Sequence, residues 1–334
     1  MTHPVDWWVS LIEAFVVINL VMVTFAYLTL AERKVMGRMQ LRYGPNRAGP
    51  RGLLQPIADL LKLLNKESFQ PREAIHWAFI LGPFLAAFTA LTTFSVIPFG
   101  PGWTIAGVYI PGQVADLNIA LVLIFAIGSI GVYGFILGGW SSDSKYALLG
   151  SMRTCAQLVS YEVALALSVL GVVLMAGTLS LTGIVAAQAD TLWYAVPQFV
   201  GLLVFLLAGT AETARAPFDL PEAEQELVAG YHTEYGGMRF GLYSMSEYIN
   251  LITISALIVT LFFDGWHFPW VHALDRLGPL WFVLKLFILL FVFIWLRTTL
   301  PRLRYDQLMS FGWKILLPVA TLNALVTAFF VVLV

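Results

Sequence analysis

Carboxylates are concentrated in one segment of the sequence, Glu212–Arg239, which lies between two long apolar stretches. The segment holds six of the chain's 20 acidic residues and only two bases, Arg215 and Arg239. The acids are Glu212, Asp219, Glu222, Glu224, Glu226 and Glu234. Carboxylates that crowd together raise one another's pKa, so this cluster is expected to take up and release protons near neutral pH. Arg215 is the expected counter-charge.

The tetrapeptide Asp219-Leu-Pro-Glu222 has the residue types with which a helix begins. Asp is a favourable N-cap, Pro fits the first turn, and Glu three residues after the cap is typical of a helix start. In such a helix Glu222 and Glu226 share a face, and Glu224 turns away from it. Capping and the helix dipole are an alternative explanation for Asp219 and Glu222 that requires no function. They do not explain Glu224, Glu226 and Glu234.

Ionisable residues also occur inside or at the ends of the apolar runs. Glu162, Glu247 and Lys285 fall within such runs, and Glu212 closes one. An ionised group near the bilayer centre costs roughly 2.5–3.5 kcal/mol on insertion scales unless it faces protein or water. We expect the three acids to be functional, whereas Lys285 is equally consistent with a structural ion pair. Glu13 lies close to the outer surface and is expected to be solvated.

Composition places the whole chain in a membrane. It has 334 residues, of which 59% are hydrophobic and 12% are charged, whereas soluble domains carry about 25% charge. A net charge of −1 argues against nucleic acid as a partner. The single cysteine, Cys155, excludes an internal disulfide and any iron–sulfur cluster held by this chain's own thiolates. No metal-ligand pattern, Walker A motif or Gly-rich dinucleotide fingerprint is present.

Apolar runs long enough to cross roughly 30 Å of hydrocarbon occur eight times. They are Ser10–Leu30, Ile75–Ile97, Leu117–Leu137, Ala156–Ala176, Val196–Ala214, Tyr243–Phe263, Leu280–Leu296 and Trp313–Leu333. The sequence therefore predicts an all-α polytopic membrane protein with eight transmembrane helices in one domain, residues 1–334. The third predicted helix carries glycines at positions 128, 131 and 134 and, directly after its apolar run, at 138, which indicate close helix packing.

The predicted loops differ sharply in Lys and Arg content. The odd-numbered loops hold 17 of the 19 bases, and the even-numbered loops hold a single one, Arg276. By the positive-inside rule the odd loops are cytoplasmic and both termini lie outside. The first loop, residues 31–74, and the acidic loop, residues 212–242, are then both on the cytoplasmic side.

The first cytoplasmic loop contains a predicted amphipathic helix over residues 52–67. Its apolar side chains fall on one helical face: Leu53, Ile57, Leu60, Leu61 and Leu64. This pattern is typical of a helix that lies in the membrane interface. Two roles stay open, namely a membrane-surface anchor and a helix that frames an entrance from the lipid.

Three parts of the sequence make the chain resemble the H subunit of respiratory complex I, the proton-pumping NADH:quinone oxidoreductase. They are Ala31–Lys34 with Gln40–Pro50 and Gly52–Pro56, then Ser144–Gly150 with Ser160–Glu162, and finally Ala211–Tyr235. The resemblance covers essentially the whole chain, including the eight expected spans and their orientation.

The resemblance implies a role at a junction. In this family the membrane protein joins the membrane arm to the hydrophilic redox arm and forms most of a quinone tunnel. Quinone, either ubiquinone or menaquinone, is then a substrate and nothing is bound covalently, while NADH, FMN and iron–sulfur clusters belong to partner subunits. The implied partners are hydrophilic quinone-site and iron–sulfur subunits, antiporter-like membrane subunits and the lipid of the cell inner membrane.

The resemblance also assigns two sets of residues. The proton-coupling set is Glu162, Glu212, Glu222, Glu224, Glu226 and Glu247. The quinone-chamber set is Glu32, Arg33, Arg38, Arg47, Arg215 and Asp219. Some relatives carry an acid on the third helix, which Leu117–Leu137 lacks, so the resemblance does not extend to a proton route through that helix.

We therefore expect a membrane subunit of a proton-translocating NADH:quinone oxidoreductase. An alternative is the equivalent ion-translocation subunit of a membrane-bound hydrogenase, against which the first-loop sequence Tyr43–Arg47 and the interfacial helix count. A further alternative is a stand-alone secondary transporter, which the missing internal repeat disfavours.

Overall fold

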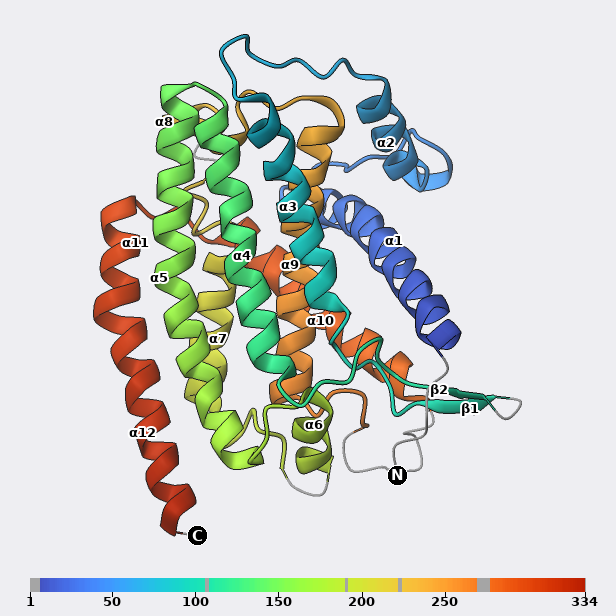
Figure 1. Ribbon diagram of the computed structural model, residues 1–334, viewed down its shortest axis with the longest axis vertical. Helices are drawn as coiled ribbons and strands as arrows, with labels where there is room; N and C mark the ends of the chain where they lie inside the picture. Colours follow the sequence, from blue (N-terminus) through green and yellow to red (C-terminus); the bar gives the residue numbers. More distant parts are fainter. Residues whose placement is uncertain (1–6, 106–107, 190–191, 222–223, 269–276, 334) are drawn as a thin grey trace.

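The computed structural model describes residues 7–105, 108–189, 192–221, 224–268 and 277–333. Long helices run side by side in a bundle, with α1 set apart at an angle and α2 and α8 at the upper end in Figure 1. α1 begins and α12 ends toward the opposite, lower end. The charge distribution of the loops assigns the upper end to the cytoplasm.

The elements follow one another with short connections. The helices are α1 (Trp7–Met39), α2 (Gln55–Asn65), α3 (His76–Phe94), α4 (Ala120–Ser141), α5 (Lys145–Ala176), α6 (Leu181–Ala189), α7 (Phe199–Glu212), α8 (Glu224–Leu227), α9 (Gly237–Phe262), α10 (Gly278–Thr299), α11 (Tyr305–Phe311) and α12 (Leu317–Leu333). Short 3₁₀ turns lie at Pro50–Gly52 and Gly230–His232, and a π-helical turn, Gly312–Leu316, joins α11 to α12. Strands β1 (Trp103–Ile105) and β2 (Val108–Ile110) form a small antiparallel hairpin between α3 and α4.

The predicted all-α membrane fold is confirmed. Within the described ranges, seven helical stretches are long and apolar enough to cross a membrane, the last being α11 to α12 taken together. The eighth predicted span corresponds to α7, which has 14 residues and is about 21 Å long at 1.5 Å per residue. The β1–β2 hairpin and the short helices α6 and α11 are additions to the predicted helices in the described ranges.

Two helices extend well beyond the predicted apolar runs. α1 continues past Leu30 to Met39, and α5 begins at Lys145 instead of Ala156. Each predicted apolar run ends at the first charged residues, but the helical backbone continues through them. As a result Glu32, Arg33 and Arg38 project from a helix, although the sequence placed them in a loop.

α9 is the most deeply buried of the long helices. It packs against α1, α2, α3, α6, α7 and α10. α2 matches the predicted amphipathic helix, and its apolar side chains, among them Leu60 and Leu64, stay about half exposed. The interior of the bundle is thus organised around α9, while α2 keeps an apolar face for the membrane interface.

The predicted glycine packing on α4 is confirmed at three of four positions. A Cβ added to Gly131 would lie 2.9 Å from the Thr89 hydroxyl, and one added to Gly134 would lie 2.8 Å from a backbone nitrogen of α3. Gly138 is covered by the hydroxyl of Tyr243. For Gly128 the packing prediction is wrong, because an added Cβ there meets nothing within 4 Å.

The described residues 219–221 are not helical, so the expectation of a helix start at Asp219 is wrong, and the next described helix, α8, begins at Glu224. The residues around Asp219 are held by tertiary contacts. Phe218 and Leu220 are fully buried in the core, and Gln157 of α5 donates a 2.8 Å hydrogen bond to the Phe218 carbonyl. Burial of these two apolar side chains outweighs the local capping preference.

Lys285 has a structural role in this fold. Its Nζ donates hydrogen bonds to the carbonyl oxygens of Phe263, Gly265 and His267, at 2.7, 3.0 and 2.7 Å. These carbonyls follow the last residue of α9, where a cation is favourable.

We expect Lys285→Met to lower the thermal-inactivation midpoint of the purified assembly. Each buried carbonyl left without its donor costs about 1–3 kcal/mol. Lys314→Met is the matched control, since Lys314 is exposed and should not matter. Equal midpoints for the two variants would contradict the structural role of Lys285.

Candidate functional site

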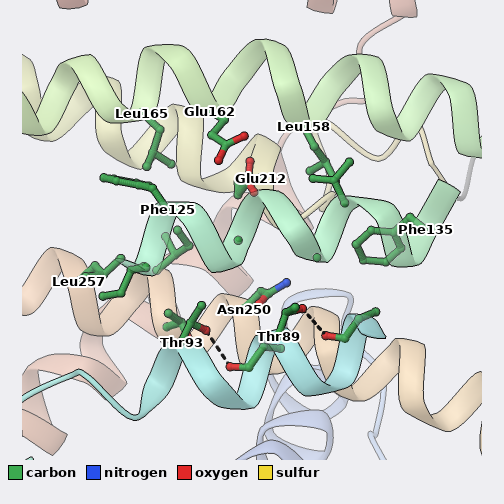
Figure 2. A pocket seen from close by; sticks show the side chains of 18 residues that line it. Thr89, Thr93, Phe125, Phe135, Leu158, Glu162, Leu165, Glu212, Asn250 and Leu257 are labelled. Atoms are coloured by element: carbon green, nitrogen blue, oxygen red, sulfur yellow. Dashed lines mark hydrogen bonds between the residues drawn. The ribbon is translucent and has the colours of Figure 1, made fainter. Parts of the chain in front are cut away.

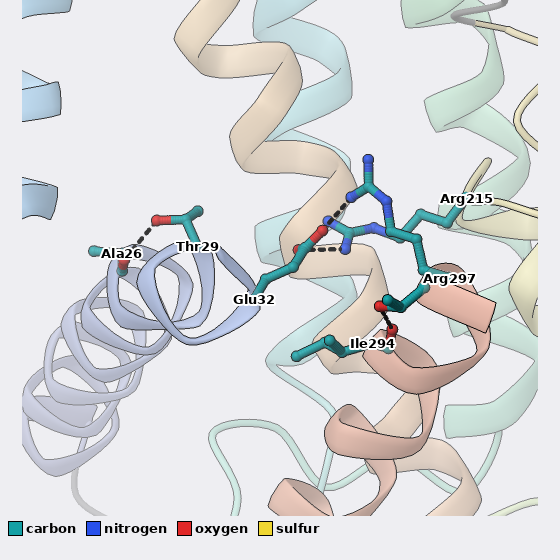
Figure 3. Close-up of polar contacts among 7 residues, drawn as sticks. Ala26, Thr29, Glu32, Arg215, Ile294 and Arg297 are labelled. Atoms are coloured by element: carbon teal, nitrogen blue, oxygen red, sulfur yellow. Dashed lines mark hydrogen bonds and ion pairs between the residues drawn. The ribbon is translucent and has the colours of Figure 1, made fainter. Parts of the chain in front are cut away.

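A buried cluster of one carboxylate and two guanidinium groups lies where α1, the segment after α7 and α10 meet (Figure 3). Glu32 accepts a 2.8 Å hydrogen bond from Nη1 of Arg215 and a second, short one from Nη1 of Arg297. The Glu32 and Arg215 side chains are only 2% and 8% exposed. The Arg215 guanidinium also lies 4.0 Å from the centre of the Tyr248 ring. We call these four residues the Glu32 cluster.

The Glu32 cluster carries more positive than negative charge. Burial by itself lowers the pKa of Arg215, but the adjacent Glu32 carboxylate outweighs it and raises that pKa above its usual value. Arg215 therefore stays charged, and Arg297 adds a second cation against the single carboxylate. Within these four residues the charge is positive, which favours an electron-rich group beside them, and Glu247 also acts on Arg215 electrostatically.

Backbone contacts fix Arg215 in place. The chain reverses at Ala214, which adopts a left-handed conformation with φ of 50°. Gln157 holds both sides of this turn, since its Nε2 donates to the carbonyls of Ala211 and Phe218, each at 2.8 Å. The turn connects Glu212 to Arg215 through only two residues. Arg215 is thereby held close to the end of α7.

Two members of this cluster, Arg297 and Tyr248, were missed at the sequence level. Glu32, by contrast, was predicted through the resemblance, and it lies on a buried stripe of α1 whose members are mostly four or seven residues apart, as expected of one helical face. The buried residues of α1 are Val9, Glu13, Val17, Val21, Leu28, Leu30, Glu32 and Gly37.

The same stripe shows that the expected solvation of Glu13 is wrong. Glu13 is 7% exposed, and neither carboxyl oxygen has a hydrogen-bond partner within the residues that the structure describes. Its position four residues from both Val9 and Val17 turns it into the protein, although it is near the outer end of the helix.

The other residues of the predicted quinone-chamber set are not gathered around Glu32. Arg33 follows Glu32 on α1 and is therefore rotated by about 100° around the helix axis, away from the Glu32 cluster. It pairs with Asp59 of α2 at 2.9 Å. Arg38 lines a separate cavity on another face of α1, and Arg47 is exposed in the following loop. Asp219 is half-buried in the stretch after Arg215.

Deeper in the bundle, Glu162 and Glu212 point toward one another across a small cavity (Figure 2). The cavity has a volume of about 60 Å³ and is enclosed by α3, α4, α5, α7 and α9, enough for a few water molecules at roughly 10–15 Å³ each by this measure. Ser129 of α4 donates a short hydrogen bond to Glu162. Oε2 of Glu212 is buried and has no hydrogen-bond partner in the described part of the chain.

The two residues before Glu162 position it on α5. The Tyr161 hydroxyl donates to the carbonyl of Leu308 at 2.8 Å, and Ser160 accepts a 3.2 Å hydrogen bond from Nε1 of Trp313. Both contacts bind α5 to the α11–α12 region. The side of α5 that carries Glu162 is thus fixed by its packing on the last helices.

A smaller cavity of about 10 Å³ continues from the first one. Glu212 and Asn250 line both cavities, and Glu247 lines the second. Glu247 accepts a 2.5 Å hydrogen bond from the Tyr231 hydroxyl. Glu162, Glu212 and Glu247 therefore form a series of embedded carboxylates with Asn250 and water-sized spaces between them. Ser129, Asn250 and Tyr231 were not singled out from the sequence.

The acids of the cytoplasmic loop are less fully described. Glu222 lies outside the described residues, and Glu224 begins α8 without a described side chain. Glu226 pairs with Arg153 of α5 at 2.5 Å, and these side chains are 47% and 31% exposed. The hydrogen bond from Arg153 lowers the pKa of Glu226. The expectation that crowding raises it is wrong for this residue, because its nearest charged partner is a base.

We expect the Arg153–Glu226 pair to contribute less than about 1 kcal/mol, as exposed pairs do. A double-mutant cycle with Arg153→Gln and Glu226→Gln, read as thermal midpoints of the assembly, measures the coupling. Because the Glu226 pKa is lowered, the coupling is fully present at neutral pH and is lost as the pH falls below about 4.3. Coupling that grows on acidification would contradict the assignment.

These features define a class of protein. A multi-span helical bundle with a buried guanidinium–carboxylate cluster at one end and embedded acids around small cavities is typical of membrane subunits in which such acids mark ion or proton routes.

Comparisons with known proteins agree. The NADH dehydrogenase family model matches residues 12–328. An H subunit of the NADH-quinone oxidoreductase of Geobacter metallireducens is 53% identical over 319 residues, 96% of this chain and 94% of the relative. An H subunit of the same enzyme from Geobacter sulfurreducens is 54% identical over 313 residues, which are 94% of this chain and 92% of the relative. The H subunit from Syntrophotalea carbinolica is 50% identical over 317 residues, which are 95% of this chain and 94% of the relative.

The chain belongs to the NADH dehydrogenase family, as a multi-pass membrane subunit of the H type. The resemblance found in the three sequence segments is confirmed, and the hydrogenase and transporter alternatives are not favoured. The chain is a component of a multi-subunit oxidoreductase.

Proposed function

We propose that this chain, as one membrane domain of residues 1–334, lines the quinone chamber of a proton-translocating NADH:quinone oxidoreductase in the cell inner membrane and couples quinone reduction to proton movement. The observation that carries the proposal is the short connection between Arg215 and Glu212. Arg215 belongs to the Glu32 cluster, and Glu212 lines the cavities between the embedded acids.

Reduction of a quinone to a quinol takes up two electrons and two protons. In the proposed mechanism, negative charge that develops on the substrate competes with Glu32 for Arg215 and Arg297. Arg215 then shifts, and the turn that joins it to Glu212 alters the surroundings of that carboxyl. A proton moves between Glu212 and its neighbours Glu162 and Glu247, through Asn250 and water in the two cavities.

The wider residue sets remain part of the proposal. The chamber comprises Glu32, Arg33, Arg38, Arg47, Arg215 and Asp219, and the coupling route comprises Glu162, Glu212, Glu222, Glu224, Glu226 and Glu247. The substrate is ubiquinone or menaquinone. NADH, FMN and the iron–sulfur clusters that deliver electrons are held by partner subunits.

The composition and activity of the purified assembly test the proposal. We expect a tagged copy of this chain to co-purify with iron–sulfur subunits, a hydrophilic quinone-site subunit and antiporter-like membrane subunits. The preparation should reduce a water-soluble quinone with NADH. An assembly that instead evolves hydrogen, or a chain that purifies alone and transports a solute, would overturn the proposal.

A further inference from the structure

A third cavity lies at the end of α1, apart from the two cavities beside the embedded acids. It has a volume of about 520 Å³ and is walled by α1, the loop that follows it and α10. Three of the residues that line it are the bases Lys34, Arg38 and Arg51, and none of its lining residues is an acid. Lys34 and Arg38 are four residues apart and so share one face of α1.

The positive charge of this cavity is not balanced locally. Neither Arg38 nor Arg51 forms a side-chain hydrogen bond or an ion pair with any residue that the structure describes. The Nζ of Lys34 donates to the backbone carbonyl of Arg51, and Arg51 is itself an exposed residue of the cavity lining. Three cations in one concave wall favour an anionic ligand.

The wall that carries these bases is formed by α1 and the loop after it, which are packed tightly together. A Cβ on Gly37 would lie 2.9 Å from the backbone nitrogen of Gly44, and one on Gly44 would lie 2.9 Å from Cα of Lys34. The loop backbone therefore lies directly against α1, at a distance that only glycine permits. The hydrogen bond from Lys34 to Arg51 closes the other end of the loop.

The position of the cavity along its two helices indicates the kind of anion. Measured along the axis of α1, Lys34 and Arg38 are about 6 and 12 Å beyond Leu30, the end of the apolar run, at 1.5 Å per residue. The opposite wall includes Phe291, which lies about 9 Å before the charged end of α10 at Arg297, measured along the axis of α10. The cavity therefore joins bases beyond the apolar run of α1 to an apolar side chain within the apolar run of α10.

We propose that this cavity binds the headgroup of an anionic phospholipid. The phosphodiester lies between Lys34, Arg38 and Arg51, and the acyl chains leave along Phe291. A neutral quinone ring does not require three cations, and a free phosphate does not use the apolar wall. Basic pockets between membrane helices on the cytoplasmic side are suited to such headgroups. The site shares Arg38 with the wider set of the proposed quinone chamber, and the Arg51→Gln variant below tests it apart from the proposed function.

Photolabelling of the purified assembly in phosphatidylcholine nanodiscs tests the site. Trace phosphatidylglycerol, with a diazirine near the start of an acyl chain, should label peptides that contain Phe291. A phosphatidylcholine analogue with the same diazirine should label them at least about fivefold less. Arg38→Gln and Arg51→Gln should each reduce phosphatidylglycerol labelling about fivefold, the contribution of one base near an anionic surface.

Lys62→Gln is the matched control, because Lys62 is an exposed base of the same loop region that does not line the cavity. It should leave labelling unchanged, and excess inorganic phosphate should not displace the lipid. Equal labelling by both lipids, unaltered labelling in both arginine variants, or displacement by phosphate would overturn the proposal. Absence of labelling in the unaltered assembly would overturn it too, since another subunit would then cover the cavity.

Discussion

Glu32→Gln is expected to abolish quinone reduction and to destabilise the assembly. The substitution removes the only carboxylate that pairs with Arg215 and Arg297 in the described part of the chain, and Arg215 is almost fully buried. Loss of one partner from a buried ion pair costs about 3–5 kcal/mol, because the other charge remains uncompensated. The yield of intact assembly and its thermal-inactivation midpoint should both fall.

A second variant separates stability from chemistry. In Glu32→Gln combined with Arg215→Met the buried cation is removed as well, so much of the lost stability should return. Quinone reduction should stay absent, because the proposed chamber then lacks both groups. Asp59→Asn is the matched control, since it breaks the exposed Arg33–Asp59 pair and should cost less than about 1 kcal/mol. Recovery of quinone reduction in the double variant would show that the Glu32 cluster is structural only.

The sequence predicted the membrane helices but could not predict the Glu32 cluster in full. Apolar runs depend on local composition, so they are visible in the chain itself. The partners of Glu32, by contrast, are 183 residues away at Arg215 and 265 residues away at Arg297. Arg297 was interpreted only as a marker of orientation, because nothing in its neighbours points to a carboxylate on α1.

The predictions made for Asp219, Arg33 and Arg38 from their sequence neighbours were incomplete because tertiary packing decides where each side chain lies. The sequence around Asp219 favours a helix start, yet burial of Phe218 and Leu220 holds it in another conformation. Arg33 and Arg38 are close in sequence, but helical rotation sends one to Asp59 and the other to the basic cavity. Hydropathy gives depth in the membrane and does not give rotation about the helix axis.

The embedded acids Glu162 and Glu247 were predicted because charge inside an apolar run is costly. The connection between these acids was not predictable, since it depends on the two small cavities that the packed helices leave between them. Gly128 lines the cavity between Glu162 and Glu212 and has open space where a side chain would begin. That space lies on α4, the helix from which an acidic side chain is absent, next to Ser129 and its hydrogen bond to Glu162.

Glu212→Gln is expected to lower NADH:quinone reductase activity roughly a hundredfold, the scale of a lost proton-transfer group. The carboxyl lines both cavities between the other embedded acids, and an amide of the same shape fills the site without exchanging a proton. NADH oxidation by a soluble artificial acceptor should be unchanged, because that acceptor takes electrons before they reach quinone. Both activities should be measured on the same membrane preparation.

Glu13→Gln is the matched control for Glu212→Gln. Glu13 is also a buried carboxyl on a membrane helix, but it lines neither of the cavities that contain Glu212. Its amide variant should retain full quinone reductase activity, so a loss specific to Glu212 reflects position and not the removal of any buried acid. If Glu212→Gln kept more than half of the activity, or if Glu13→Gln lost as much, the route through Glu212 would be wrong. Glu212→Asp should restore part of the rate, because it keeps a carboxyl that can carry the proton.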